Sequence, residues 1–500
     1  SSGGGTPPEM PNGQKPDGQN SSGGGTPPEM PNGQAPGGQG GPGGADTQTY
    51  DYSGTVSGTL TADGEDVVSD GETISSDTAD VNTALAENGG ILTVTNGTLN
   101  KSGDDTNGDN CNFYGLNSIV LAVGSESQAV IADSTLTADS EGSNGIFATD
   151  NATVYASNDT ITTTSGNSRG LDATYGGTVI ADSMTISTSG DHSAALATDR
   201  GGGNISVTNS TLTTEGSGSP LLYSTGTIEV ENVTGTSTGS QIAAMEGFNT
   251  ILISNSELTS ERTDTTGSDN VANGIFIYQS TSGDADTSAG ETALFQAVDS
   301  ELTSLVENGA MFYLTNTTAN VVLSSNTINY DEQSNDLILV SGNAVNNWGT
   351  PGSNGADTTF TALNQVLSGN VSVDSISSLD LFLLDGSSLT GSTEITENEI
   401  NTTPSETPLT VSVDSTSSWI VTGDSTVSEL HAEEGAAITD ADGKTVTIIA
   451  DGETVVEGDS AYTVTVTGTF STVVSTSELN EISDAGIDRS GFEEYVNSVG

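Results

Sequence analysis

The sequence predicts an all-β fold, a right-handed parallel β-helix, because it repeats itself about every 25 residues. A constant period in this range is typical of a solenoid, in which each repeat buries its apolar face against its neighbours. The intervals between the repeated positions are 37, 25, 25, 26, 46, 44 and 26 residues. We interpret 46 as two turns of 23, and 37 and 44 as single turns that carry insertions. The repeated aliphatic positions are Leu99, Leu136, Ile161, Ile186, Leu212, Leu258, Leu302 and Ile328.

Three short apolar clusters within each repeat indicate three strands per coil. The clusters are rich in β-branched residues and are bounded by Gly, Asn, Asp or Ser, whereas an apolar period of 3.6 residues is missing. A propeller fits less well, since a blade needs about 40 residues and four strands. We therefore expect about 12–14 coils over residues 50–430, with strands about 4.8 Å apart from coil to coil. Two successive repeats have their clusters at 145–148, 153–156 and 160–162, and at 170–173, 178–181 and 185–187.

The period also predicts which side chains stack on one another inside the β-helix. If the period reflects coils, Leu136, Ile161, Ile186 and Leu212 lie in one internal column.

Composition changes at both ends of the chain and predicts three parts. Residues 1–45 form a Pro/Gly-rich arm, residues 46–430 the β-helix, and residues 431–500 a C-terminal capping region. Within the last part, residues 443–475 are interpreted as antiparallel hairpins. The apolar spacing in residues 477–499 predicts one or two short helices with a capping or docking role.

The arm contains a duplicated cassette, since SSGGGTPPEMPNGQ occurs twice without a change. A segment of this composition does not bury enough apolar surface to fold alone. Two interpretations remain open: a flexible tether, or a docking arm through which copies of the chain assemble head to tail. The assembly candidates are Pro7, Pro8, Met10, Pro27, Pro28 and Met30.

The charge is extreme, with 68 acidic residues against 7 Lys and Arg, a net charge of −61. Nucleic-acid binding is excluded in practice, because it depends on basic side chains that neutralise phosphate. Cys111 is the single cysteine, so an intrachain disulfide is impossible. No apolar run approaches the length of about 18 residues that spans a membrane. Because the chain begins at Ser1, we expect that a leader was removed and that the protein is secreted or at the cell surface.

Two segments carry resemblances to known families. The pattern Ser417-x-Trp419-x-Val421-x-Gly423-x-Ser425 resembles the C-terminal end of pertactin-like autotransporter passenger β-helices and covers about 20 residues. The block from about 50 to 430, through segments 168–177, 192–201 and 348–355, is similar to secreted adhesin-like β-helix proteins of anaerobic bacteria and methanogens. A looser similarity is to calcium-dependent, carbohydrate-binding β-helices related to pectate lyases. These resemblances imply surface exposure and glycan contact, without establishing catalysis.

Five residues on adjacent coils are candidates for glycan binding: Arg169, Asp172, Tyr175, Asp199 and Arg200. Two guanidinium groups, two carboxylates and an aromatic ring form a suitable patch, and a structural Tyr–Arg stack with local ion pairs is the alternative. A lyase needs a base beside a bound Ca²⁺, and a hydrolase needs paired carboxylates. No specific constellation of either kind is evident, so we assign no catalytic residue and expect no enzyme activity.

A metal site is predicted at Asp105, Asn107 and Asp109, whose alternating oxygen ligands are like the start of a calcium loop. The segment departs from the EF-hand pattern, and ordinary Asx turns are the alternative. Weak Ca²⁺ binding is expected. The sequence thus favours a non-enzymatic surface protein, an adhesin or a self-assembling structural subunit whose partners are its own copies or surface glycans. The alternative is a calcium-dependent carbohydrate-binding or polysaccharide-lyase-like β-helix.

Overall fold

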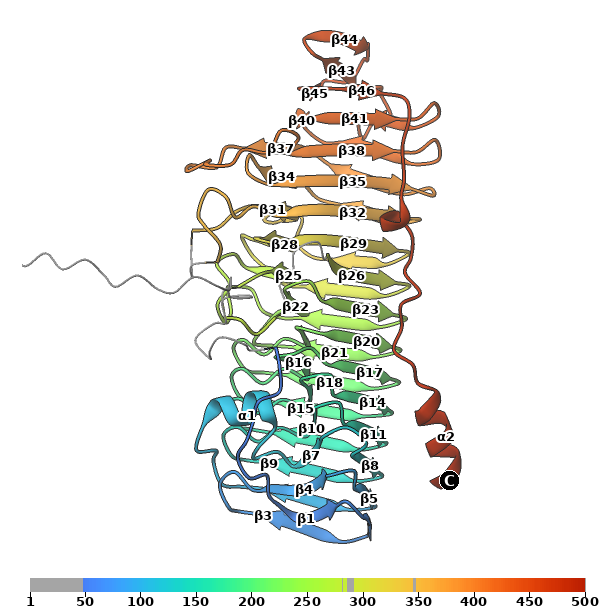
Figure 1. Cartoon of the computed structure of the whole chain (residues 1–500). Coiled ribbons are helices and arrows are strands. Elements are labelled where there is room, and N and C mark those ends of the chain that lie inside the picture. Colours follow the sequence, from blue (N-terminus) through green and yellow to red (C-terminus); the bar gives the residue numbers. More distant parts are fainter. Residues whose placement is uncertain (1–47, 281, 286–291, 345–347, 500) are drawn as a thin grey trace, which may run out of the picture. The chain divides into compact units, whose positions relative to one another are not determined.

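The computed structural model describes residues 48–280, 282–285, 292–344 and 348–499. Within these ranges the chain forms the right-handed parallel β-helix that the period predicts (Figure 1). Each complete coil contributes one strand to each of the three sides of the β-helix, and strands on the same side of successive coils pair in parallel. The first sheet has 13 strands among the described residues, which agrees with the 12–14 coils expected. The assembly candidates Pro7, Pro8, Met10, Pro27, Pro28 and Met30 lie outside the described residues.

The sheets are ordered as follows. The first consists of β1 (Gly58–Asp63), β4 (Asn82–Glu87), β7 (Val120–Val123), β10 (Ile146–Thr149), β13 (Leu171–Ala173), β16 (Leu196–Thr198), β19 (Leu222–Ser224), β22 (Ala243–Glu246), β25 (Asn273–Tyr278), β28 (Ala310–Thr315), β31 (Asp336–Val340), β34 (Val371–Asp374) and β37 (Thr393–Thr396). The second consists of β2 (Asp66–Asp70), β5 (Ile91–Thr95), β8 (Gln128–Ala132), β11 (Thr153–Ser157), β14 (Thr178–Asp182), β17 (Asn204–Thr208), β20 (Thr227–Glu231), β23 (Thr250–Ser254), β26 (Ala293–Val298), β29 (Thr318–Ser324), β32 (Asp357–Leu363), β35 (Ser378–Leu384), β38 (Leu409–Val413), β41 (Glu429–Ala432) and β46 (Phe470–Ser471).

The third side of the β-helix is divided between two sheets. The third sheet consists of β3 (Thr73–Ser76), β6 (Thr98–Lys101), β9 (Thr135–Ala138), β12 (Thr160–Thr163), β15 (Thr185–Thr188), β18 (Thr211–Thr214), β21 (Thr234–Ser237), β24 (Glu257–Ser260), β27 (Glu301–Ser304) and β30 (Thr327–Asn329). The fourth consists of β33 (Val366–Ser368), β36 (Ser388–Gly391), β39 (Ser418–Val421) and β42 (Ala437–Thr439). A fifth, near the C-terminal end, is ordered β40 (Ser425–Val427), β45 (Thr463–Val466), β43 (Thr447–Ala450) and β44 (Glu453–Val456).

The internal column in the third sheet is confirmed. Leu136, Ile161, Ile186 and Leu212 are partners in register on successive strands, and each side chain is at most 1% exposed. The interval of 46 residues is also two turns of 23, because Gly235 occupies the intervening position in the column. A Cβ atom there would lie 2.8 Å from Leu221 Cδ1, so the large neighbouring side chains leave room only for glycine.

Polar ladders hold the turns that precede the third sheet. A side-chain oxygen in one coil accepts a hydrogen bond from a backbone N–H in the preceding coil. Ser134 Oγ accepts from Gly97 N at 2.9 Å, and Asp159 Oδ1 accepts from Ser134 N at 2.8 Å. Farther along, Asn326 Oδ1 accepts from Ser300 N at 3.0 Å. The chain therefore satisfies buried backbone donors with Ser, Asp or Asn at equivalent positions.

The insertions form the surroundings of the site described below. The interval of 37 residues contains α1 (Gly108–Tyr114), a helix that the sequence interpretation missed. Its signals are an N-cap at Asn107 and a left-handed C-cap at Gly115 (φ 73°), but the helix has only seven residues, of which Cys111 and Phe113 are buried. The turn after β24 is likewise longer than its counterparts in other coils, as are the intervals after β25 and β31, which are described in part.

The C-terminal region differs from the predicted cap in two ways. Strands β41 and β46 continue the second sheet, so the β-helix extends beyond residue 430. Residues 443–475 contain one antiparallel hairpin, β43–β44, whereas β45 pairs in parallel with both β40 and β43. The reason is that the chain makes a further coil-like turn before it ends. At the C-terminal end of the β-helix, Trp419 is fully buried and donates from Nε1 to Gly391 O at 3.0 Å.

The last segment, which we call the tail (residues 477–495), lies along the second sheet instead of at its end (Figure 1). It contains a 3₁₀ helix (Glu478–Asn480) and the first part of α2 (Ser490–Val499). It runs back from β32 toward β5, because Tyr495 Oη lies 3.5 Å from Thr93 Oγ1. The other contacts along this path are Asn480 with Thr361, Ser483 with Gln296, Ile487 with Glu229, and Phe492 with Tyr155.

Arg489 is the main polar anchor of the tail, and Arg489→Ala is expected to release it. Its guanidinium donates to Ser206 O and Oγ at 3.0 and 2.8 Å, to Ala181 O at 3.0 Å and to Thr208 Oγ1 at 3.1 Å. Hydrogen bonds from a charged donor contribute about 1.5–3 kcal/mol each, so the variant should be cleaved in the tail at least about tenfold faster by a dilute protease. Lys444→Ala, which removes an exposed cation far from the tail, is the control. Equal cleavage rates would show that the apolar contacts hold the tail without Arg489.

In the part of the chain that the structure describes, no helix has the length and apolar character needed to cross a bilayer.

Candidate ligand-binding pocket

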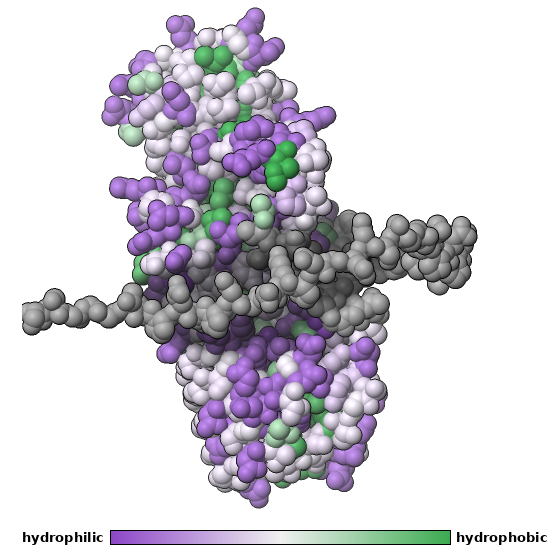
Figure 2. Space-filling model, turned by 90° about the vertical axis from the view of Figure 1, so that its left-hand side faces the viewer, coloured by the Kyte–Doolittle hydropathy of each residue, from purple (hydrophilic) through white to green (hydrophobic). Residues whose placement is uncertain are grey.

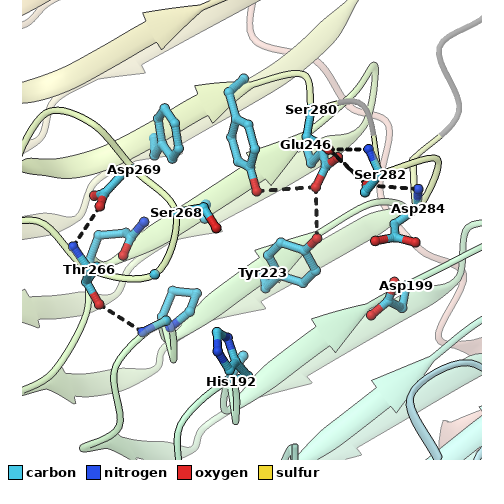
Figure 3. Close-up of a pocket in the computed structure, with 18 of the residues that line it drawn as sticks. His192, Asp199, Tyr223, Glu246, Thr266, Ser268, Asp269, Ser280, Ser282 and Asp284 are labelled. Carbon is cyan, nitrogen blue, oxygen red and sulfur yellow. Dashed lines mark hydrogen bonds between the residues drawn. The ribbon is translucent and has the colours of Figure 1, made fainter. Parts of the chain in front are cut away.

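A pocket of about 510 Å³ lies on the outer face of the first sheet (Figure 3). Strands β19, β22 and β25 are its floor, which Ala194 and Asp199 extend on either side of β16. Its walls come from α1 and from the long turns that follow β24, β25 and β31, which contribute Thr266, Asp284 and Trp348 among others. The insertions in the repeat therefore converge on one place, although they are far apart in the sequence.

The register of the first sheet explains why the floor is hollow. Outward-facing residues at one position of successive strands alternate between large and small around the pocket. Ala244 lies between Tyr223 on one side and Phe276 on the other, and its methyl group leaves space that a larger side chain would fill. The residues in register along this column are Phe147, Asp172, Ala197, Tyr223, Ala244, Phe276 and Tyr313.

Aromatic rings make one wall of the pocket. Phe276 and Tyr278 are stacked, with ring centroids 4.1 Å apart and planes 5° apart. Trp348 closes the wall, 4.9 Å from the Tyr278 ring and tilted by 34°. Phe276 is also stacked on Tyr313 at 5.3 Å, so Tyr278 and Trp348 supply the aromatic surface against which the C–H face of a sugar or an organic cation can pack.

Glu246 is a buried carboxylate in the pocket, 4% exposed, that accepts hydrogen bonds from four hydroxyl groups (Figure 3). Tyr223 Oη and Tyr278 Oη donate at 3.0 and 3.2 Å, Ser282 Oγ donates at 3.0 Å, and Ser280 Oγ donates as well. Burial is the main reason that the pKa of Glu246 is raised above its usual range. The hydrogen-bond donors to this carboxylate are thus all neutral. Among the described residues, no guanidinium or ammonium group pairs with it.

Arg169, Asp172 and Asp199, three of the glycan-binding candidates, are in contact. Arg169 Nε lies 3.7 Å from Asp172 Oδ2, and Arg169 Nη2 lies 3.5 Å from Asp199 Oδ2. The guanidinium also donates from Nη1 to Asn112 Oδ1 on α1. Arg169 and Asp199 line the pocket, whereas Asp172 is fully buried behind them. Burial raises the pKa of both carboxyl groups, and the charge of Arg169 opposes that rise.

The other two candidates, Arg200 and Tyr175, lie outside the pocket lining. Arg200 pairs with Asp284 (Nε to Oδ1, 2.6 Å), and its guanidinium carbon lies 3.5 Å from the ring centroid of Phe113. Tyr175 is 6% exposed and stacks on Tyr114 at 5.6 Å. The structure therefore corrects the placement of Tyr175, since its ring is covered and is not part of the pocket wall. The Tyr–Arg stack proposed as the alternative is replaced by Tyr175–Tyr114 and Arg200–Phe113.

Further polar groups complete the pocket. Gln241 is 5% exposed and lines it; its Oε1 accepts from Ser240 Oγ at 2.6 Å, whereas Nε2 has no hydrogen-bond partner among the described residues. Asp269 accepts from Thr266 N at 2.6 Å and from Asn273 Nδ2 at 2.7 Å, and burial raises its pKa to about 7. His192 lies on the lower side of the pocket in Figure 3.

The predicted calcium segment adopts a different local structure from a calcium loop. Asn107 caps α1, with its Oδ1 accepting from Asp109 N at 3.0 Å. Asp105 is partly buried, and burial raises the pKa of its carboxyl group. Among the described residues, no group of three or more His, Cys, Asp or Glu is arranged to hold a metal ion. Weak Ca²⁺ binding at Asp105, Asn107 and Asp109 stays a prediction.

The comparisons with known proteins show similarity in fold at most. No family model matches the chain, and no curated protein matches it. Among solved structures, a chain from "The cryo-EM structure of the Vag8-C1 inhibitor complex" is similar, with 13% sequence identity and a TM-score of 0.42. The match covers 82% of this chain and 100% of that chain.

Proposed function

We propose that the protein is an extracellular surface protein of the adhesin kind that binds a carbohydrate in the pocket on the first sheet and does not turn it over. The observation that carries the proposal is the combination in one pocket of the Tyr278–Trp348 aromatic wall with buried carboxylates. Sugars are recognised by this combination, because the ring packs its C–H face on an aromatic side chain and its hydroxyls donate to carboxylates. Gln241 Nε2, which has no hydrogen-bond partner in the described part of the chain, adds a donor for a ligand oxygen.

The surface and the charge of the chain are compatible with this proposal. The face in Figure 2 is mostly hydrophilic where the residues are described, and its hydrophobic residues occur in small, separate groups. A net charge of −61 keeps such a protein soluble at a cell surface.

The arginines support binding over lyase chemistry. A lyase base has to be unprotonated when it takes up a proton from the substrate. Burial lowers the pKa of Arg169, but Asp172 and Asp199 more than offset this and raise it overall. Asp284 does the same for Arg200. Both guanidinium groups are thus held in their charged form, that of Arg169 in the pocket lining and that of Arg200 outside it.

Tyr278→Ala is expected to weaken glycan binding at least about tenfold, since it removes part of the aromatic wall and a hydrogen bond to Glu246. The ligand is found by screening the full chain on a glycan array, and its affinity is measured by titration calorimetry. Tyr155→Ala is the matched control, because this tyrosine is also partly buried on an outer sheet face but packs against the tail.

Two results would contradict the proposal. If Tyr278→Ala binds every glycan as tightly as the parent, the pocket is not the binding site. If incubation of the parent with a bound glycan releases new reducing or unsaturated ends, the protein is an enzyme.

A further inference from the structure

Two of the carboxyl groups that line the pocket lack a cationic partner among the described residues. Arg169 serves two carboxylates, Asp172 and Asp199, and Arg200 is used by Asp284. Glu246 has hydroxyl partners only, and Asp269 is held by a backbone N–H and an amide. His192 also lines the pocket, and the guanidinium of Arg262, outside the lining, donates to the carbonyl oxygens of Asp264 and Thr265. Among the carboxyl groups that line the pocket, Glu246 and Asp269 thus have no ion-pair partner in the described part of the chain.

The aromatic wall of the pocket favours a cationic ligand, as its carboxylates do. Phe276 is stacked between Tyr278 and Tyr313, so the ring surface that the pocket offers comes from Tyr278 and Trp348, whose π-systems attract a cation within about 6 Å. Glu246 is hydrogen-bonded directly to the Tyr278 hydroxyl, so a carboxylate and a ring face belong to one rigid unit. Aromatic faces next to buried carboxylates are the chemistry that recognises an ammonium group.

The arrangement suits an organic cation more than a metal ion. The carboxylates are spread around the walls, and among the described residues they do not converge as a group that could hold a metal. A pocket of about 510 Å³ also has room for a sugar ring together with its substituents.

We infer that the pocket selects a carbohydrate that carries a protonated amine, an amino sugar whose nitrogen is not acetylated. This inference rests on the proposed function and names the class of its ligand. The sugar ring packs on Tyr278 and Trp348, and its ammonium group supplies the positive charge that Glu246 and its neighbours lack. An N-acetyl group at the same position is neutral and bulkier, so it leaves the carboxylate charge without compensation.

The test compares three oligosaccharides of the same length and linkage: β-1,4-linked glucosamine, its N-acetylated form and the corresponding glucose oligomer. Affinities for the full chain are measured by calorimetry at about pH 6, where the amine is protonated. The glucosamine oligomer is expected to bind at least about tenfold more tightly than the other two. Glu246→Gln is expected to reduce this preference to less than about threefold.

Nonspecific attraction to a protein of net charge −61 needs a matched control. Asp139→Asn makes the same carboxyl-to-amide change as Glu246→Gln, but Asp139 is exposed and outside the pocket lining. It should keep the full preference, and an equal loss in both variants would show that the attraction is nonspecific. Because Glu246 is buried, Tyr278→Phe, which keeps the ring and removes one hydroxyl partner of Glu246, is a milder second variant and should reduce the preference in part.

The failures of the two proposals are distinguishable. If the N-acetylated or glucose oligomer binds in the pocket as tightly as the glucosamine oligomer, the amine inference is overturned and the proposed function stands. If none of the three binds, and no other glycan binds in a way that Tyr278→Ala abolishes, the proposed function itself is wrong.

Discussion

Ile161→Asp is expected to abolish cooperative folding of the central coils. Ile161 is fully buried between Leu136 and Ile186 in the third sheet. The substitution removes the apolar contacts of a large side chain and places a carboxylate where no cation or donor is available, which should lower the free energy of unfolding by more than about 4 kcal/mol. In a solenoid each coil contacts only its neighbours, so the loss should be greatest around β9, β12 and β15.

Circular dichroism during thermal unfolding and amide hydrogen exchange measure this result. Thr160→Asp is the matched control, because Thr160 is the exposed neighbour on the same strand, and its side chain points away from the column. Its free energy of unfolding should differ from that of the parent by no more than about 0.5 kcal/mol. A variant Ile161→Asp with unchanged unfolding and exchange would mean that the column is not the core of the protein.

The fold was predictable because it depends on residues at a constant interval. Leu136, Ile161, Ile186 and Leu212 are alike in kind and spacing, and stacking is the arrangement that buries all of them at once. Arg169, Asp172 and Asp199 were expected in one patch because they lie on adjacent coils, and Arg169 contacts both carboxylates.

The pocket was less predictable, because its walls come from the insertions, where the repeat gives no register. Trp348 lies in the turn after β31, and nothing in the spacing indicates that it contacts Tyr278. Glu246 was inconspicuous among 68 acidic residues, and only its position in register with Tyr278 on β25 distinguishes it. Tyr175 was misjudged since α1, which carries Tyr114 against it, was not recognised.

Asp159→Asn is expected to stabilise the protein, and the gain should grow as the pH rises from about 4 to about 8. Asp159 is 1% exposed, in the turn before β12, and burial raises the pKa of its carboxyl group to about 8. Below about pH 4 the carboxyl group is protonated in both the folded and the unfolded chain, so it causes no pH dependence. Above that, the unfolded chain loses the proton while the folded chain keeps it, and folding becomes less favourable by about 1.4 kcal/mol for each pH unit. Above about pH 8 the penalty is complete, at as much as about 5 kcal/mol.

Asparagine reproduces the protonated acid without this penalty. Its Oδ1 can still accept from Ser134 N, as Asp159 Oδ1 does at 2.8 Å. The fold already uses an amide at the equivalent position of another coil, where Asn326 Oδ1 accepts from Ser300 N and Asn326 Nδ2 donates to Ala297 O at 2.7 Å. Chemical denaturation at about pH 4, 6 and 8.5 should therefore give a difference between variant and parent that is small at the lowest pH and largest at the highest. Asp139→Asn, an exposed carboxylate one coil away, should show no such trend. A difference for Asp159→Asn that is constant with pH would mean that Asp159 is ionised in the folded protein throughout this range, and that the buried ladder tolerates its charge.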